Sequence, residues 1–292
     1  MLRSVPLLSV AGLMFLAATA GGEPIADVRT AYLVPSDRTY SSEYELAIID
    51  ALENLQDWYA GELGGLTFAL HDPVVEVFNT PHPADYYATN QSNANDPFSL
   101  WFWANTITDA FSLTGAGFND PAHAWIFYID AEPAAGQIGG AGTSGVAVLP
   151  EHDLRGLIGG DPLPVSRWVG GLGHELGHAF GLPHPAECEA QSPACPSQAL
   201  MWLGYLTYPD TFLLPDDRST LLASRFIGST AESVPEPATG LLVFSGCLGV
   251  TIARLRRATK ARLTTEVPSA QATRRPSQAC GDGGPFESHS ST

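Results

Sequence analysis

Large apolar residues recur at helical spacing in one early segment of the chain. In SSEYELAIIDALENLQDWYAGELGG (41–65) the repeating positions are Ile48, Leu52, Leu55 and Tyr59, which lie about one turn apart on the same face of a helix. A capping box of Ser42 and Glu45 predicts where this helix begins, and Gly64-Gly65 predicts where it ends. The segment is therefore expected to form an amphipathic helix with one buried face.

Other segments carry short runs of apolar, β-branched and aromatic residues, which are typical of strands. Four such runs predict strands, namely DVRTAYLV (27–34), PVVEVFN (73–79), HAWIFYID (123–130) and VAVLP (146–150). A second helix is predicted over 95–115, with Asp96 as its cap and Pro97 in its first turn. A closing helix is expected within 213–228, with Asp216 or Asp217 near its N-terminus. Strands that alternate with helices in this way predict an α/β fold.

A further helix is predicted immediately before a cluster of histidines, in RWVGGLGHELGHAFGLPH (167–184). Ser166 can cap this helix, and Gly181 is expected to end it because glycine accepts a left-handed backbone. His174 and His178 are four residues apart, so they lie on one face of the helix. Once the chain turns back at Gly181, His184 can reach the same point from outside the helix.

Three neutral imidazoles around one point are the ligand set of a catalytic zinc ion, with the fourth position left to water. Glu175 lies beside the first ligand and is the natural general base for that water. Histidines on a helix face are more often surface or hydrogen-bonded core residues. However, five specified positions within eleven residues favour zinc.

The extended motif HExxHxxGxxH resembles the signature of the metzincin metallopeptidases, and the resemblance covers roughly residues 27–230. The segment GLPHP, with Pro185 after the third histidine, is most similar to the serralysin and matrixin branches. The resemblance implies an α/β (α+β) catalytic domain. In such a domain a twisted mixed sheet with backing helices lies above the zinc cleft, and a small irregular subdomain lies below it.

The resemblance also implies further site residues. Met201, in ALMWLGY, would form the methionine turn under the metal. Relatives that place a tyrosine near the metal carry it two positions after the methionine, where this chain has Leu203; Tyr205 comes two positions later, and its contact with the site is left open. The edge strand that pairs with an extended substrate would consist of Gly145, Val146, Ala147, Val148 and Leu149.

Both ends of the chain carry export features. Residues 1–20 combine Arg3, an apolar run and Ala18-Thr19-Ala20, which predicts a secretory signal peptide. In an oxidising compartment Cys188 and Cys195, which lie in one loop, are expected to form a disulfide. Additional zinc ligation is the alternative, although their spacing matches no usual cysteine zinc motif.

After the expected catalytic domain (21–232), residues 233–257 contain VPEP, an uncharged run over 238–253, and three arginines. This arrangement resembles the PEP-CTERM sorting signals of exported bacterial proteins, which implies an exosortase-type transpeptidase as partner. It also implies a cell-surface or extracellular location, with membrane association through 238–253 before processing. The tail that follows (258–292) is longer than in such signals, and its composition predicts disorder.

The body of the chain is strongly acidic. Residues 21–237 contain 6 Arg, no Lys and 28 Asp or Glu, a net charge of −22. This charge argues against nucleic acid as a partner, because phosphates would be repelled. The acids could serve solubility or form weak Ca²⁺ sites, and nothing in the sequence supports the second role.

These features predict an exported zinc endopeptidase that hydrolyses polypeptides through a metal-bound water and Glu175. Two alternatives remain open at this point. One is a non-catalytic protein on the same scaffold that binds surface matrix, against which the intact Glu175 argues. The other is a peptidase of narrow specificity that cuts one partner.

The sorting hypothesis predicts a change of location. Deleting 238–257 should convert a surface-associated protein into one found freely in the medium, and replacing the three arginines by glutamine should weaken retention. Cell fractionation of the full-length and deleted forms checks this. Identical fractionation of the two forms would exclude a sorting role for the segment.

Overall fold

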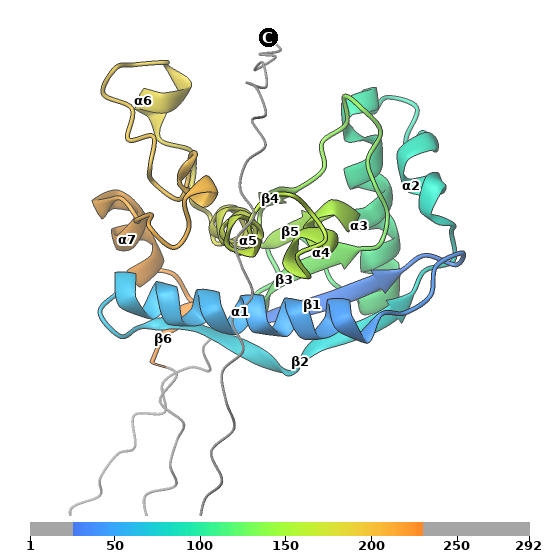
Figure 1. Cartoon of the computed structure of the whole chain (residues 1–292), viewed down its shortest axis with the longest axis horizontal. Helices are drawn as coiled ribbons and strands as arrows, with labels where there is room; N and C mark the ends of the chain where they lie inside the picture. The colour runs from blue at the N-terminus through green and yellow to red at the C-terminus, as the bar shows by residue number, and fades with distance from the viewer. Residues whose placement is uncertain (1–25, 230–292) are drawn as a thin grey trace, which may run out of the picture. The chain divides into compact units, whose positions relative to one another are not determined.

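The computed structural model describes residues 26–229 of the 292-residue chain. In this part of the chain six strands form one sheet, in the order β4-β5-β3-β1-β2-β6 (Figure 1). The strands are β1 (Asp27–Val34), β2 (Thr67–Asn79), β3 (His123–Ile129), β4 (Ala141–Thr143), β5 (Val146–Leu149) and β6 (Ile227–Gly228). The four predicted strands are all present, and β2 begins earlier than the sequence indicated.

The centre of the sheet is parallel and its two margins are antiparallel. β1 pairs in parallel with β2 and β3, and β3 pairs in parallel with β5. β4 and β6 run antiparallel to β5 and β2. Parallel neighbours need long crossovers. Helices form the connections from β1 to β2 and from β2 to β3, whereas a loop and β4 connect β3 to β5. The fold is therefore the mixed α/β fold that the sequence predicted.

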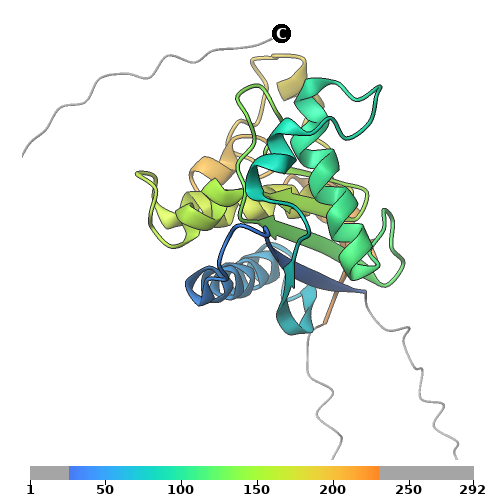
Figure 2. The ribbon, with the colours of Figure 1, turned by 90° about the vertical axis from the view of Figure 1, so that its right-hand side faces the viewer.

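Helices cover both faces of the sheet (Figure 2). On one face lie α1 (Ser42–Glu62), α4 (Glu151–Leu157) and α5 (Val165–Ala179), and on the other lie α2 (Ala84–Thr89), η1 (Phe98–Leu100) and α3 (Trp101–Thr114). Alternate residues of a strand point to opposite faces. Thus Val28 and Tyr32 of β1 enter the core under α1 and α5, whereas Ala31 and Leu33 enter the core under α3.

The chain after α5 forms the smaller, irregular part of the domain. It contains α6 (Ala186–Glu189), η2 (Gly204–Leu206), α7 (Pro215–Leu222) and β6, separated by loops (Figure 1). The closing helix and its acidic first turn are confirmed: the carboxylate of Asp217 accepts a hydrogen bond from the Leu214 N–H at 3.1 Å. In Figure 1 this segment lies to the left of α5, with α6 above α7, and it returns to the sheet at β6.

Three predicted helix starts differ from the structure by a few residues. The oxygen that caps α1 belongs to Ser41, which accepts from the Tyr44 N–H. Pro164, not Ser166, precedes the first turn of α5. Asp96 caps no helix: Pro97 is the residue that precedes η1, and the Asp96 carboxylate accepts a hydrogen bond from the Ser92 hydroxyl. In each case another residue that tolerates an extended backbone occupies the boundary.

The prediction that Gly145–Leu149 form the edge of the sheet was wrong. Gly145 precedes β5, and β5 pairs with β3 on one side and with β4 on the other. All four residues of β5 are buried. The edge is β4, a three-residue strand that the glycine-rich composition of its segment concealed.

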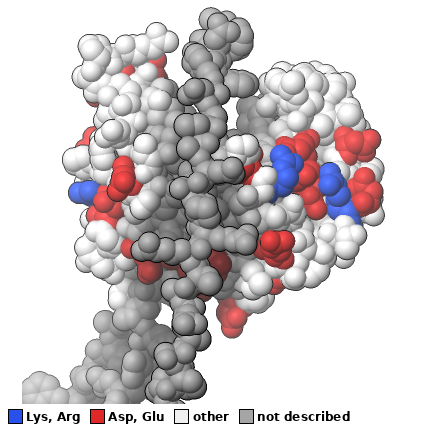
Figure 3. Space-filling model, in the orientation of Figure 1, with Lys and Arg blue, Asp and Glu red and all other residues white. Residues whose placement is uncertain are grey.

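Several predictions lie outside the described residues. These are the signal peptide (1–20), the sorting segment (233–257) and the tail (258–292). Within 26–229, no helix combines the length and the apolar character needed to cross a membrane. Figure 3 shows one face of the molecule, where acidic side chains lie at several places and basic ones at only a few.

Cys188 and Cys195 form the predicted disulfide, which closes a loop just after His184. Such a short loop should stabilise the fold by about 2 kcal/mol, chiefly by restricting the unfolded chain. Replacing both cysteines by alanine should lower the free energy of unfolding by about that amount, as measured by urea denaturation. Peptide mapping of the untreated protein without reductant should show the linked pair. Two alkylatable thiols there would contradict the bridge.

Candidate metal centre

The three predicted histidines converge on one point. Their Nε2 atoms are separated by 3.1 Å (His174–His178), 3.0 Å (His178–His184) and 3.3 Å (His174–His184). Two of them project from successive turns of α5, and the third comes from the loop after the helix. No other triad with ligand spacing among residues 26–229 consists of histidines alone.

Backbone carbonyls orient the two helical imidazoles. His174 Nδ1 lies 2.7 Å from the carbonyl oxygen of Leu200, and His178 Nδ1 lies 2.8 Å from that of Leu182. A carbonyl oxygen can only accept, so each Nδ1 carries the proton and each Nε2 keeps its lone pair. This is the tautomer that an inward-pointing metal ligand needs.

The end of α5 creates one of these carbonyl contacts. Gly181 adopts φ 98°, its N–H donates to the His178 carbonyl at 3.0 Å, and the Leu182 N–H donates to the Gly177 carbonyl at 2.9 Å. These two bonds form a Schellman motif, which reverses the chain after the helix. The predicted stop at Gly181 is confirmed. It turns the Leu182 carbonyl towards His178 and brings His184 back to the site.

Met201 lies beneath the metal centre, in the turn that also supplies the Leu200 carbonyl. Its side chain is fully buried. A Cβ atom built on Gly177, between the two helical histidines, would lie only 2.4 Å from the Met201 sulfur. Methionine can fill such an irregular space closely because its side chain is unbranched. Glycine at 177 therefore permits the close packing that holds the turn against α5.

The third imidazole has aromatic and acidic neighbours. The rings of His184 and Trp202 meet edge to face, with centroids 5.2 Å apart. Its Nδ1 lies 3.6 Å from a carboxylate oxygen of Glu189, next to the disulfide loop. The loop that follows the helix therefore positions His184 from two sides.

The electrostatics of the cluster favour neutral imidazoles. Burial is the main cause that lowers the pKa of His174 to about 4, and positive charge on His178 and His184 lowers it further. The hydrogen bond to the Leu200 carbonyl raises the pKa but does not offset these effects. Burial, with a smaller contribution from His184, also lowers the pKa of His178. Only a neutral imidazole can ligate a metal. The site is thus prepared for a cation at neutral pH.

Glu175 lies against the edge strand. Burial raises its pKa to about 7, and the negative charge of Asp153 raises it further, while a hydrogen bond from the Gly142 backbone N–H and the charge of Arg167 lower it. A Cβ atom on Gly142 would lie 2.0 Å from the Glu175 carbonyl oxygen. The absence of a side chain at position 142 therefore lets β4 approach α5 closely enough to contact the glutamate.

A polar cavity of about 220 Å³ opens beside Glu175 and His174, and its wall includes residues that the sequence analysis did not identify. Arg167 stacks on the rings of Trp168 and Tyr205, at 4.4 and 4.8 Å from their centroids. Helical spacing could have placed Arg167 on the histidine face, since it lies seven residues before His174. Asp153 of α4 carried no such signal.

Tyr205 lies at the metal centre. The sequence had left open whether it contacts the site. Its ring centroid is 5.3 Å from that of His174. It borders both the polar cavity and a second cavity of about 230 Å³ lined by His184, Trp202 and Leu203. Two cavities therefore border the histidines. Tyr205 lies two positions farther along the chain from Met201 than the resemblance implied, and it belongs to the 3₁₀ turn η2, which places its ring at the site.

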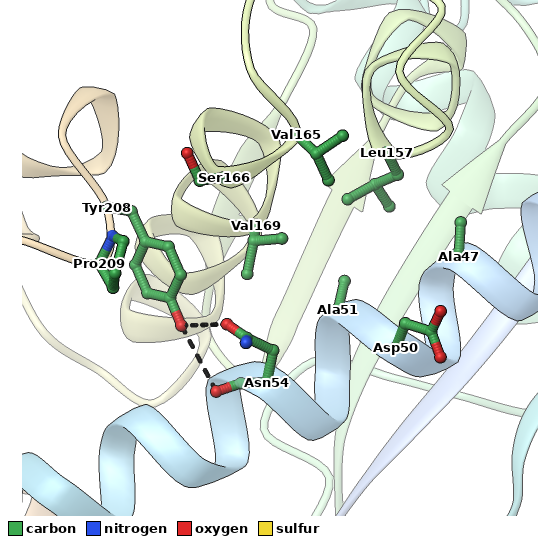
Figure 4. A pocket seen from close by; sticks show the side chains of 10 residues that line it. All are labelled: Ala47, Asp50, Ala51, Asn54, Leu157, Val165, Ser166, Val169, Tyr208 and Pro209. Atoms are coloured by element: carbon green, nitrogen blue, oxygen red, sulfur yellow. Dashed lines mark hydrogen bonds between the residues drawn. The ribbon is translucent and has the colours of Figure 1, made fainter. Parts of the chain in front are cut away.

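A further cavity, of about 380 Å³, lies elsewhere, between α1 and α5 (Figure 4). Ala51 and Val169 form part of its apolar wall. Tyr208 closes one end and donates to the side-chain oxygen of Asn54 at 2.6 Å. It contains neither a metal-ligating histidine nor Glu175, so it does not belong to the centre described above.

The donor set fits zinc. Three neutral imidazole nitrogens at mutual distances of 3.0–3.3 Å can surround one ion at the Zn–N distance of about 2.0–2.1 Å. Among the His, Cys, Asp and Glu side chains of residues 26–229, no fourth joins this group, so a coordination position would be left for water or substrate.

Comparisons with known proteins give likenesses of fold alone. No protein-family model and no curated protein sequence matches the chain. OgpA from Akkermansia muciniphila aligns with TM-score 0.47 and 19% identity, over 69% of this chain and 61% of that one. Archaemetzincin from Methanopyrus kandleri aligns with TM-score 0.37 and 18% identity, over 68% and 97%. A zinc-dependent peptidase from Methanocorpusculum labreanum aligns with TM-score 0.29 and 13% identity, over 65% and 99%. The chain thus spans about three fifths of the length of OgpA.

Proposed function

We propose that this protein is a zinc-dependent endopeptidase. The observation that carries the proposal is the placement of a half-buried glutamate beside three converging imidazoles, at an accessible cavity. His174, His178 and His184 would hold the ion. When bound, zinc would acidify a water molecule and polarise the substrate carbonyl.

Glu175 would act as the general base and then as the general acid. Its carboxylate, with a pKa near neutrality, can accept a proton from the attacking water. It can then deliver that proton to the leaving amine nitrogen. The C–O bond to the water oxygen forms first, the C–N bond breaks once the amine nitrogen is protonated, and no covalent intermediate with the protein is required. The Gly142 N–H keeps the carboxylate facing the cavity.

The substrate would be an extended polypeptide. β4 is the outer strand of the sheet and contacts Glu175, so a chain laid along β4 would pass the base. Two cavities border His174, one beside Glu175 and one beside Trp202. A substrate can therefore continue past the reacting bond in both directions, which supports cleavage within a chain.

A binding protein without catalysis is the alternative from another class. It would need the imidazoles and the edge strand. It would have no use for a half-buried acid beside the metal, because ionising a carboxyl group away from water costs free energy. A narrow-specificity peptidase would keep Glu175 but would leave casein intact. A casein digestion assay therefore separates the general peptidase from both alternatives.

Export is also proposed for this protein, with a final location at the bacterial surface or outside the cell. The Cys188–Cys195 disulfide supports an oxidising compartment. The signal peptide over 1–20 and the sorting segment over 233–257, with its exosortase-type partner and temporary membrane association, rest on the sequence.

Substitutions at the centre should separate metal binding from catalysis. Glu175→Ala and Glu175→Gln should retain zinc yet lose roughly 10²–10⁴-fold or more in kcat/KM on casein-derived peptides, because the proton acceptor is gone. His178→Ala should lose the zinc of this centre as well, since two ligands hold it poorly. Metal analysis and peptide hydrolysis measure the two effects. The exposed Glu187→Gln is the matched control and should change neither. Full activity of Glu175→Ala would refute the proposal.

Moving the edge strand should also impair the enzyme. The Cβ atom of Gly142→Ala would overlap the Glu175 carbonyl, so β4 must shift away from α5. We expect a loss of roughly 1–3 kcal/mol in the free energy of unfolding and a lower kcat/KM. Thr143→Ala alters an exposed side chain of the same strand and serves as control. Equal behaviour of the two variants in urea denaturation and peptide hydrolysis would contradict the assigned contact.

A further inference from the structure

A second cluster of metal-ligating side chains lies on the sheet, away from α5. Asp27, His71 and His123 come from the three neighbouring strands β1, β2 and β3. Asp27 and His123 are direct partners in the β1–β3 pairing. The β1–β2 register shifts between Val28 and Thr30, and this irregularity in β2 brings His71 beside Asp27.

The three side chains already contact one another. One carboxylate oxygen of Asp27 lies 2.8 Å from His71 Nδ1, and the other contacts His123 Nδ1. The two imidazole rings meet edge to face, with centroids 5.5 Å apart. One donor atom from each residue lies within 4.8 Å of the other two. The side chains are 22–26% exposed, so an ion from solvent can reach them.

The charges around the cluster favour a cation. The hydrogen bond from Arg29 lowers the pKa of Glu76, and His71 and His123 add smaller contributions. Burial opposes the lowering of the Asp120 pKa, which results from hydrogen bonds from the Trp125 side chain and the Ala122 N–H, with a smaller contribution from His123. Arg29 is the nearest cation and is neutralised by a bidentate ion pair with Glu76, at 2.5 and 2.9 Å. Arg225 donates to the Asp120 carbonyl. Among the described residues no arginine forms an ion pair with Asp27 or Asp120, and the only basic side chains within ion-pair distance of Asp27 are the two imidazoles of the cluster.

We propose that Asp27, His71 and His123 form a second binding site for a divalent transition metal of the zinc class. Two imidazoles and one carboxylate suit such an ion, and water would complete its coordination. The ion would replace the hydrogen bonds that Asp27 now accepts from both imidazoles. It would join three adjacent strands at one end of the sheet, which gives it a structural role.

This site is independent of the proposed catalytic centre. Asp27 alternates in phase with Ala31 and Leu33, and His123 alternates with Trp125 and Phe127, so both point to the face that α3 covers. The catalytic histidines belong to α5 and its loop, and α5 packs on the opposite face. The two sites can therefore be tested one at a time.

Zinc titration of the full chain tests the proposal. The parent should bind one more zinc ion per chain than His71→Ala or His123→Ala, measured by metal analysis after gel filtration and by calorimetry. The two variants should keep the peptidase activity of the parent. His82→Ala is the matched control because His82 also pairs with a single aspartate, Asp109, at 2.8 Å, without a third ligand. It should bind as much zinc as the parent.

A second measurement leaves the cluster intact. His178→Ala, in the full chain, should still bind one zinc ion and should rise in Tm as zinc is added, because a ligand that binds only the folded state stabilises it. Adding His123→Ala to this variant should abolish both effects. Equal zinc content of the parent and the His71→Ala and His123→Ala variants would overturn the proposal. A His178→Ala protein without zinc or thermal response would overturn it too, and would show that Asp27 serves only as a hydrogen-bond acceptor for two histidines.

Discussion

The metal centre depends on two hydrogen bonds from imidazoles to backbone carbonyls. His174 bonds to Leu200 and His178 to Leu182, and these bonds fix both the tautomer and the direction of each ring. Without them, rotation about the side-chain torsions would disperse the Nε2 atoms, and a loose cluster binds metal poorly. Both carbonyls lie outside α5. The centre therefore requires the Schellman turn after the helix and the Met201 turn beneath it, and not the helix alone.

The rest of the fold holds these parts together at short range. Glycine at position 177 admits the Met201 side chain, and glycine at position 142 admits the edge strand against Glu175. The sheet keeps β4 beside α5 because β4 pairs with the buried strand β5. Glycines at these two contacts allow β4 and the Met201 turn to pack closely against α5. Glu175 and the three neutral imidazoles therefore lie close enough together to act on one substrate.

The sequence predicted the elements better than their contacts. Helical periodicity identified α1, an apolar, β-branched and aromatic run identified β3, and the spacing of HExxHxxGxxH identified the three histidines that converge, because all three signals are local. The edge strand was assigned to Gly145–Leu149 because β4 is short and glycine-containing, so it carries no apolar alternation. The carbonyls of Leu182 and Leu200 could not be predicted, since backbone groups carry no sequence signal. Tyr205 reaches His174 through a 3₁₀ turn that the motif spacing does not encode.

The most direct test of this account is a crystal structure of the zinc-loaded full chain, with the metal located by anomalous scattering at the zinc edge. We expect a peak about 2.0–2.1 Å from the Nε2 atoms of His174, His178 and His184, with Nδ1 of His174 and His178 still bonded to the carbonyls of Leu200 and Leu182. Zinc bound through other atoms of these residues, or no zinc between the three imidazoles, would contradict the account.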